Sequence, residues 1–143
     1  MAILNYTTQI DSFKTIGEIQ KVLVSHGAQS INVDYDVAGN PSALTFFMMI
    51  ENNPVNFRLP SNYHGVRKSL EKDRKVPTKL KTDAQAIRVS WRIIKDWIEA
   101  QMAIIEAGLA EMAEIFLPYA VTSSGATLYQ HIKGDMKLLT EGQ

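Results

Sequence analysis

Residues 44–50 read LTFFMMI, and this uninterrupted run of apolar, β-prone side chains decides the fold. Such a run is typical of a central strand that is covered on both faces. Turn-forming residues bound it, with AGNP at residues 38–41 before it and NNP at residues 52–54 after it. The sequence therefore predicts that residues 44–50 form the middle strand of a sheet.

The segments next to this run predict two further strands. Before it, Ile31, Val33 and Tyr35 alternate with polar residues, which is the period-two pattern of a half-buried strand. After it, residues 55–59 form a third short β-prone segment that Pro60 ends. Three strands joined by short turns predict an antiparallel meander, and residues 3–10 are a candidate fourth strand.

A helix is predicted before the sheet, over residues 16–26. Thr15 and Glu18 have the spacing of a capping box, in which each side chain satisfies a free backbone amide. Apolar residues then recur at helical spacing, and Gly27 stands where a left-handed residue often ends a helix.

Helical patterns dominate from Ser61 onward. Ser61 is expected to cap a helix that runs to Leu70, with Tyr63 and Val66 on its apolar side. The stretch KVPT at residues 75–78 interrupts this pattern and predicts an exposed loop.

The longest predicted helix follows that loop. Thr82 is expected to cap it, Gln85 stands at the position of a second capping box, and Gly108 marks its end after Ala107. Residues 109–116 continue the helical pattern, and Pro118 ends or bends it. Turn residues at 123–125 then separate it from a short helix over residues 128–132.

Together these patterns predict one α+β domain over residues 1–143. A short antiparallel meander would pack against the long amphipathic helix, with shorter helices beside it. Residues 1–60 would be mainly sheet with one helix, residues 61–134 mainly helical, and residues 135–143 a loose tail. A chain of 143 residues has the length of one domain.

The predicted helix over residues 82–107 is apolar over most of its circumference. Its polar residues share one arc of about 100°: Gln85, Arg88, Arg92, Lys95, Asp96 and Glu99. Since one sheet covers only one apolar face, the rest must meet another helix of the chain or a second copy. Trp91 and Trp97 are expected to point into two different contacts, in the core or in an oligomer interface. This surface is the main argument for a homo-oligomer.

Positive charge is concentrated in the middle of a chain whose formal net charge is zero. Residues 58–96 hold eleven basic and four acidic residues, a net charge of +7, and the other 104 residues carry −7. Such a split favours a positive surface that faces phosphates or a polyanion. The alternative is a solvated face whose cations pair with neighbouring acids.

Five of these cations are candidate phosphate-binding residues: Arg58, Arg67, Lys68, Arg88 and Arg92. Arg58 interrupts an apolar strand end just before a predicted helix start. There its guanidinium fork and free helix amides could hold a phosphate. Tyr63 and His64 follow closely and are candidates to stack on a base.

Each candidate has a structural alternative. Tyr63 could pack on the core, and Arg58 could bridge to Asp34 or Asp36 on the adjacent strand. The cations of the long helix either line a groove as a row of phosphate contacts or face solvent and pair locally with Asp96 and Glu99.

The sequence predicts no catalytic residue, cofactor or metal site. The chain has no cysteine, which excludes disulfides, thiolate metal sites and a cysteine nucleophile. Its three histidines, His26, His64 and His131, lack the usual metal-ligand spacings. No P-loop, G-x-G-x-x-G or G-x-S-x-G motif occurs. Asp34 and Asp36, on one strand face, are a candidate pair for general acid–base work.

Nothing in the sequence predicts a membrane partner. No apolar run reaches the roughly 18 residues that span a bilayer, and residues 1–13 lack the basic lead and apolar centre of a secretion signal. The absence of cysteine suits a reducing compartment. We therefore expect a cytoplasmic protein.

Four segments carry a resemblance: AIRVSWRIIKDWIEAQ (residues 86–101), EIFLPY (residues 114–119), FRLP (residues 57–60) and Gly27-Ala28. In these segments, which span most of the chain, it resembles a family of small uncharacterised proteins that phages and prophages encode. The resemblance implies a phage origin and an infected host cell as the location, and it implies no settled activity. By analogy of outline alone, the chain is similar to phage anti-defence sponges, which bind a host's nucleotide immune signal and withhold it.

The first hypothesis is a binding protein that sequesters a small phosphate-bearing ligand, such as a nucleotide-derived immune signal, without catalysis. Its pocket would lie between helices or between subunits. A second hypothesis is a nucleic-acid-binding accessory protein of phage replication or recombination, which would use the same arginines and show a steep salt dependence. A third is a protein–protein inhibitor that docks its basic face on an acidic host enzyme.

Overall fold

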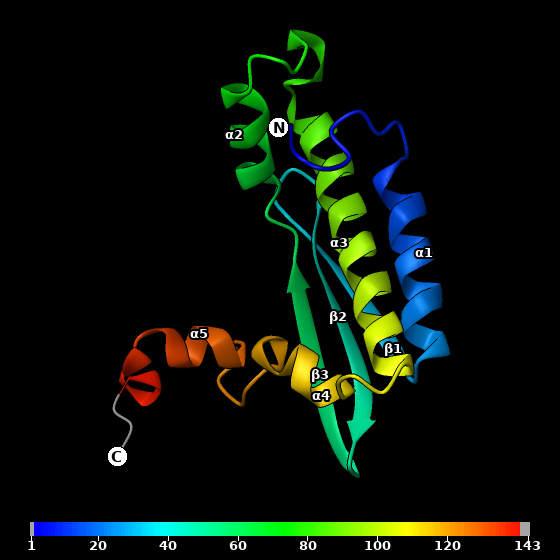
Figure 1. The fold of residues 1–143 in the computed structure, drawn as a ribbon, viewed down its shortest axis with the longest axis vertical. Coiled ribbons are helices and arrows are strands. Elements are labelled where there is room, and N and C mark those ends of the chain that lie inside the picture. The colour runs from blue at the N-terminus through cyan, green and yellow to red at the C-terminus, as the bar shows by residue number, and fades with distance from the viewer. Residues whose placement is uncertain (1, 141–143) are drawn as a thin grey trace.

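Three antiparallel strands form one sheet in the computed structural model, which describes residues 2–140. The order is β1 (Ser30–Tyr35), β2 (Pro41–Ile50) and β3 (Asn53–Pro60). The LTFFMMI run lies in β2, the middle strand (Figure 1). The predicted meander is therefore confirmed, and with the long helix beside the sheet so is the α+β fold class.

The two faces of the sheet differ in how well they are covered. One face contributes apolar side chains to the core, namely Leu44, Phe46, Met48, Phe57 and Leu59. On the other face Thr45 and Phe47 are half-buried, and Met49 is 43% exposed. The prediction that both faces of β2 are covered is thus only partly right. The outward face keeps Phe47 half-buried but leaves Met49 exposed.

Helix α1 (Ser12–Ser25) begins four residues earlier than predicted. Its N-cap is Asp11, whose carboxylate accepts a hydrogen bond from Phe13 N at 3.1 Å. Thr15 is buried within the helix and Glu18 bonds to the long helix, so the capping box predicted for this pair is wrong. The end of α1 is as expected, because Gly27 follows with a φ of +108°.

Residues 3–10 form turns instead of a fourth strand. Asn5 has a φ of +65°, a conformation that interrupts an extended strand. The segment lies along the long helix, where the buried amide of Gln85 donates to Tyr6 O at 2.8 Å and Thr8 O at 2.9 Å. A side chain thus supplies the partners that a neighbouring strand would otherwise supply.

Helix α2 (Tyr63–Lys72) is capped by Asn62, whose side chain accepts from Gly65 N at 3.2 Å. The predicted cap, Ser61, is instead buried, with its hydroxyl 2.7 Å from that of Ser90 on the long helix. The loop after α2 forms where it was predicted and contains a short 3-10 helix, η1 (Thr78–Leu80).

Helix α3 (Asp83–Glu106) is the long helix that the sequence predicts. Thr82 Oγ1 accepts from Gln85 N at 3.1 Å, and Gly108 follows the C-terminal end with a φ of +75°. Only half of the predicted capping box forms, because the Gln85 side chain binds residues 6 and 8.

The chain after α3 is more broken than predicted. Residues 107–111 leave the helix before α4 (Met112–Phe116), η2 (Leu117–Tyr119) and α5 (Leu128–Lys133). The part of the predicted loose tail that the structure describes holds a further short helix, η3 (Met136–Leu139), and residues 141–143 lie outside the described residues. Figure 1 shows α5 and η3 extending away from the sheet and α3.

Helices α1 and α2 both contact α3, so helices of the same chain meet much of its remaining apolar surface. Trp91 is fully buried, and its indole N–H donates to Pro41 O at 3.3 Å. Trp97 is half-buried and packs its edge on Phe116 and Tyr119, with ring centroids 5.4 and 5.6 Å away. The two tryptophans therefore occupy two different contacts, as predicted, and both contacts are within this chain.

Candidate functional site

The five predicted phosphate-binding cations lie at three separate places. Arg58 is on β3, on the partly covered face of the sheet. Arg67 and Lys68 are on α2, and Arg88 and Arg92 are on the side of α3 that meets α1 and the N-terminal segment. The structure therefore does not bring these side chains into one site.

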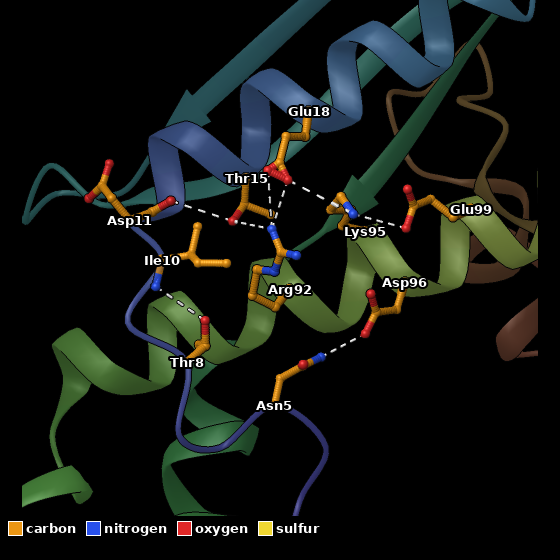
Figure 2. A network of polar contacts seen from close by, with 10 residues as sticks. All are labelled: Asn5, Thr8, Ile10, Asp11, Thr15, Glu18, Arg92, Lys95, Asp96 and Glu99. Atoms are coloured by element: carbon orange, nitrogen blue, oxygen red, sulfur yellow. Dashed lines mark hydrogen bonds and ion pairs between the residues drawn. The ribbon is translucent and has the colours of Figure 1, made fainter.

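Arg92 joins α3 to α1 (Figure 2). Its Nη1 lies 2.9 Å from Glu18 Oε1 and 3.4 Å from Thr15 Oγ1, and its side chain is 15% exposed. The hydrogen bond from Arg92 holds the pKa of Glu18 below its ordinary value. Lys95 stands beside this pair and bonds Glu99 at 2.9 Å. The Lys95–Glu99 pair is the local pairing of the structural alternative, but Arg92 pairs across to α1, so the stripe does not face solvent as that alternative predicts.

Arg88 acts on the fold through Gln85. Its Nε and Nη2 donate to Gln85 Oε1 at 3.0 and 2.7 Å. This contact leaves the NH₂ group of Gln85 to bind the carbonyls of Tyr6 and Thr8. The guanidinium of Arg88 therefore fixes the orientation of a buried amide.

The two cations of α2 differ in their surroundings. Arg67 bonds Glu71 at 2.6 Å and Asp83 at 3.0 Å, which ties α2 to the start of α3. Lys68 is exposed, and within residues 2–140 it forms no ion pair.

Tyr63 takes its structural alternative, whereas base stacking by the exposed His64 stays a prediction. Tyr63 is buried in the core, and its hydroxyl donates to Asp36 Oδ2 at 2.9 Å. His64 stacks on Tyr63 with the ring centroids 4.1 Å apart. The backbone N–H of Asn40 and then the Tyr63 hydroxyl hold the pKa of Asp36 below its ordinary value. Asp36 thus accepts hydrogen bonds in a turn.

Arg58 holds a hairpin against the sheet. Residues 120–128 form this hairpin, in which Leu128 N donates to Ala120 O at 2.7 Å. Val121 N donates to Asn56 O at 2.7 Å, which fixes the hairpin to the free edge of β3. Arg58 Nη1 donates to Gly125 O at 2.9 Å. It bridges neither Asp34 nor Asp36, and no carboxylate of residues 2–140 forms an ion pair with it.

Arg58 also lines a cavity of about 460 Å³ between the end of β3 and the C-terminal segment. Tyr119 and Tyr129 contribute two aromatic rings, and Lys133 contributes a second cation. The remaining walls are Pro60, Pro118, Thr127 and Gln130. This cavity combines groups that bind phosphate with groups that stack on a planar ring.

A second, smaller cavity of about 290 Å³ adjoins the first. Pro60 and Tyr119 line both cavities, and the second is completed mainly by apolar side chains of α3, Ile93, Ile94 and Trp97. The two cavities together place a compartment that holds two cations next to a mainly apolar one.

Sequence reasoning identified Arg58 and missed the other residues of this cavity. Tyr119, Tyr129 and Lys133 lie some sixty to seventy-five positions further along the chain. They reach Arg58 only because residues 120–121 pair with the free edge of β3. The single available signal was the exposed-edge position of β3, since a free edge commonly pairs with another segment.

Within residues 2–140, no group of three or more His, Asp or Glu side chains is placed to hold a metal ion. None of the described helices has the length and apolar character that crossing a bilayer requires. No family model, curated protein or solved structure matches this chain.

Proposed function

We propose that this protein binds a small phosphate-bearing ligand with a planar ring, of the nucleotide class, and sequesters it without chemical change. One observation carries the proposal. Arg58 and Lys133, neither of which forms an ion pair within the described chain, line the same cavity as the rings of Tyr119 and Tyr129. Its volume of about 460 Å³ lies in the range of small-molecule sites.

The two cations suit a phosphate group. A guanidinium has five N–H donors, and the single hydrogen bond of Arg58 to Gly125 O leaves others for a ligand. Its planar fork fits two phosphate oxygens, whereas the Lys133 ammonium acts as a compact point charge. Because Gly125 fixes the Arg58 side chain before binding, little conformational entropy remains to be lost.

The two tyrosines suit a planar ring. Tyr119 is half-buried and already packs on Trp97, so its position is fixed. Tyr129 is 50% exposed on α5 and could cover a bound ring from the other side. Aromatic stacking of a base on such side chains contributes roughly 1–3 kcal/mol.

The phage resemblance gives the proposal a biological role. In an infected cell, a protein that holds a nucleotide immune signal would withhold it from its host effector. Small molecules released by heating the protein, after purification from cells with active defence signalling, would identify such a signal by mass spectrometry.

Self-association is part of the proposal. The C-terminal arm, residues 128–140, exposes apolar side chains that a second copy could cover, because Leu138 is 68% and Leu139 is 75% exposed. Sedimentation at increasing protein concentration should show a dimer or higher oligomer, and L138S/L139S should be monomeric. A wild-type protein that stays monomeric at high concentration contradicts the proposed self-association and leaves the ligand-binding proposal standing.

Calorimetric titration tests the binding proposal with named probes: adenosine and guanosine 5′-diphosphates, cyclic dinucleotides, adenosine and pyrophosphate. A nucleotide should bind more tightly than adenosine or pyrophosphate, because each of these lacks one half of the recognised chemistry. Lys133→Ala should weaken nucleotide binding about tenfold, the size expected for one charge-assisted contact. Tyr129→Ala should weaken it by a similar factor.

The matched control is Lys137→Ala, which removes the same charge from the same arm outside the cavity. It should leave both affinity and thermal stability unchanged. Arg58→Lys keeps the charge but removes the planar guanidinium fork, so it tests whether the fork binds the phosphate. The circular dichroism and melting temperature of this variant show whether the hairpin over residues 120–128 stays docked. Absence of heat with every probe, or equal affinities of wild type and Lys133→Ala, would overturn the proposal.

A further inference from the structure

One end of the molecule carries a group of cations that form no ion pair within the described residues. This lysine-rich end comprises Lys68, Lys72, Arg74, Lys75, Lys79 and Lys81. None of the six forms an ion pair within residues 2–140. Among the nearby acids, Glu71 and Asp83 pair with Arg67, whereas Asp73 lies within the group and its carboxylate accepts from Lys75 N. A net positive charge therefore remains unneutralised at this end.

The lysine-rich end is an ordered part of the fold. Figure 1 shows α2 and the loop after it at the end of the molecule away from α5. Val76 anchors the loop in the core and is 2% exposed. Lys81 Nζ donates to Glu71 O at 3.3 Å, which ties the returning chain to α2.

The cations lie close to one another on this end. Lys68 and Lys72 are one helical turn apart on α2. Lys72 and Arg74 line one shallow depression together with Ile3, Ser69 and the single acid Asp73. Lys75 and Lys79 are exposed on the loop that continues from Arg74. The arrangement is a strip of positive charge along α2 and the α2–α3 connection.

We propose that the lysine-rich end binds the phosphate backbone of nucleic acid, independently of the ligand cavity. Regularly spaced phosphates are the polyanion that such a strip neutralises, and each neutralised phosphate releases condensed counterions. The rest of the chain is acidic, so electrostatic attraction turns this end toward the nucleic acid.

The composition of the strip favours nucleic acid over other anionic partners. Five of its six cations are lysines, which are depleted in protein–protein interfaces. Leu70 and Val76 are buried, and Val66 and Leu80 are half-buried and packed against the core, so the segment presents no exposed large apolar side chain to a bilayer. No aromatic residue occurs in residues 65–81, so binding would use charge without base stacking.

The test is fluorescence anisotropy with a labelled 20-base-pair duplex and with the corresponding single strand. Binding should be micromolar at about 50 mM salt. The slope of log K against log salt should lie between about −3 and −5 for the duplex, because at most six phosphates are contacted. Changing the base sequence should leave the affinity within about twofold, since no base is read.

Two double variants with the same charge change separate a local surface from bulk charge. K72Q/K75Q alters the lysine-rich end, whereas K14Q/K21Q alters exposed lysines of α1. The first should weaken duplex binding about five- to tenfold and reduce the salt slope by about two. The second should change the affinity by less than twofold. Lys133→Ala alters the ligand cavity and should leave duplex binding unchanged. The ligand-binding proposal and the nucleic-acid proposal can therefore fail independently of each other.

Three outcomes would overturn the proposal. The duplex and the single strand could both fail to bind at 50 mM salt. The two double variants could weaken binding equally, which would show that bulk charge acts. Vesicles containing phosphatidylserine could bind while nucleic acid does not, which would assign the strip to a membrane surface.

Discussion

Arg92 of α3 and Glu18 of α1 form an ion pair, with Nη1 2.9 Å from Oε1 and 3.3 Å from Oε2. The two side chains are 15% and 32% exposed, so solvent screens them less than a surface pair. The same guanidinium approaches Thr15 Oγ1 at 3.4 Å (Figure 2). The pair ties α1 to α3. Because its guanidinium is bound to Glu18, Arg92 is not available to bind a phosphate.

Arg92→Ala is expected to lower the free energy of unfolding by about 1–2 kcal/mol, because Glu18 and Thr15 lose their partner. Urea denaturation measures this change. The pKa of Glu18 lies below its ordinary value in the fold, so the contribution is present above the unfolded pKa and is lost as pH falls through the folded pKa. Lys14→Ala, on the exposed side of α1, should change stability by less than 0.5 kcal/mol. An equal loss in both variants would contradict the prediction.

The sequence predicted the sheet and the helices because their signals are local. Alternation in Ile31 and Val33, the LTFFMMI run and the cap at Thr82 each act within a few residues. The contacts of the polar side of α3 were not predicted, because they are not local. Such a stripe is normally solvated, but here Arg92 meets Glu18 and Gln85 meets residues 6 and 8. Those contacts depend on the tertiary position of α1 and of the N-terminal segment, which no local pattern encodes.

Phe116→Ala is expected to destabilise the fold by about 3–5 kcal/mol, because it leaves a cavity in the core. The ring is fully buried and contacts Phe46, Phe57 and Trp97, with centroids 5.7, 6.0 and 5.4 Å away. Thermal denaturation measures the loss. The matched control is Leu109→Ala, since Leu109 is 77% exposed. A melting temperature lowered equally in both variants would show that Phe116 does not anchor the C-terminal segment.

The candidate cavity could be predicted only in part. Arg58 stands out in the sequence because it interrupts an apolar strand end. Its cavity partners Tyr119 and Lys133 come from a segment whose position is set by backbone pairing to the edge of β3. Backbone pairing uses groups that every residue carries, so it leaves little trace in side-chain patterns. The other predicted arginines do not join Arg58 in one site. Each of them bonds a polar side chain of its own helix or of a neighbouring helix instead.

Gln85→Leu is expected to detach the N-terminal segment from α3. The Gln85 side chain is 1% exposed and donates to Tyr6 O and Thr8 O, so its loss leaves two carbonyls and the Arg88 guanidinium unmatched. The free energy of unfolding should fall by about 2–3 kcal/mol. Hydrogen exchange in residues 2–11 should be faster in the variant than in the wild type, and this increase should exceed any increase in α3. Gln101→Leu, at a half-buried position of the same helix, should leave exchange in residues 2–11 unchanged. Unchanged protection in Gln85→Leu would contradict the role assigned to the amide.

The contact between His26 and Glu106 predicts a pH-dependent stability. His26 Nδ1 lies 2.8 Å from Val22 O and Nε2 lies 2.6 Å from Glu106 Oε1. Both oxygens accept hydrogen bonds, so the protonated imidazole, which donates from both ring nitrogens, satisfies both contacts. The Val22 carbonyl raises the pKa of His26, burial opposes this rise, and Glu106 adds to it.

A raised folded pKa stabilises the fold fully below the unfolded pKa of about 6.5, and the gain is lost as pH rises through the folded pKa. Between pH 5.5 and 8.5 the wild type should therefore lose about 0.5–1 kcal/mol more stability than His26→Gln, which does not titrate. Urea denaturation at several pH values measures the difference. The His26 ring signals in an NMR titration provide a second measurement, and a midpoint at or below 6.5 would contradict the raised pKa. Because His26 joins the end of α1 to the end of α3, the variant should also increase exchange in the last turn of α1 at pH 5.5, where the wild-type contact is complete.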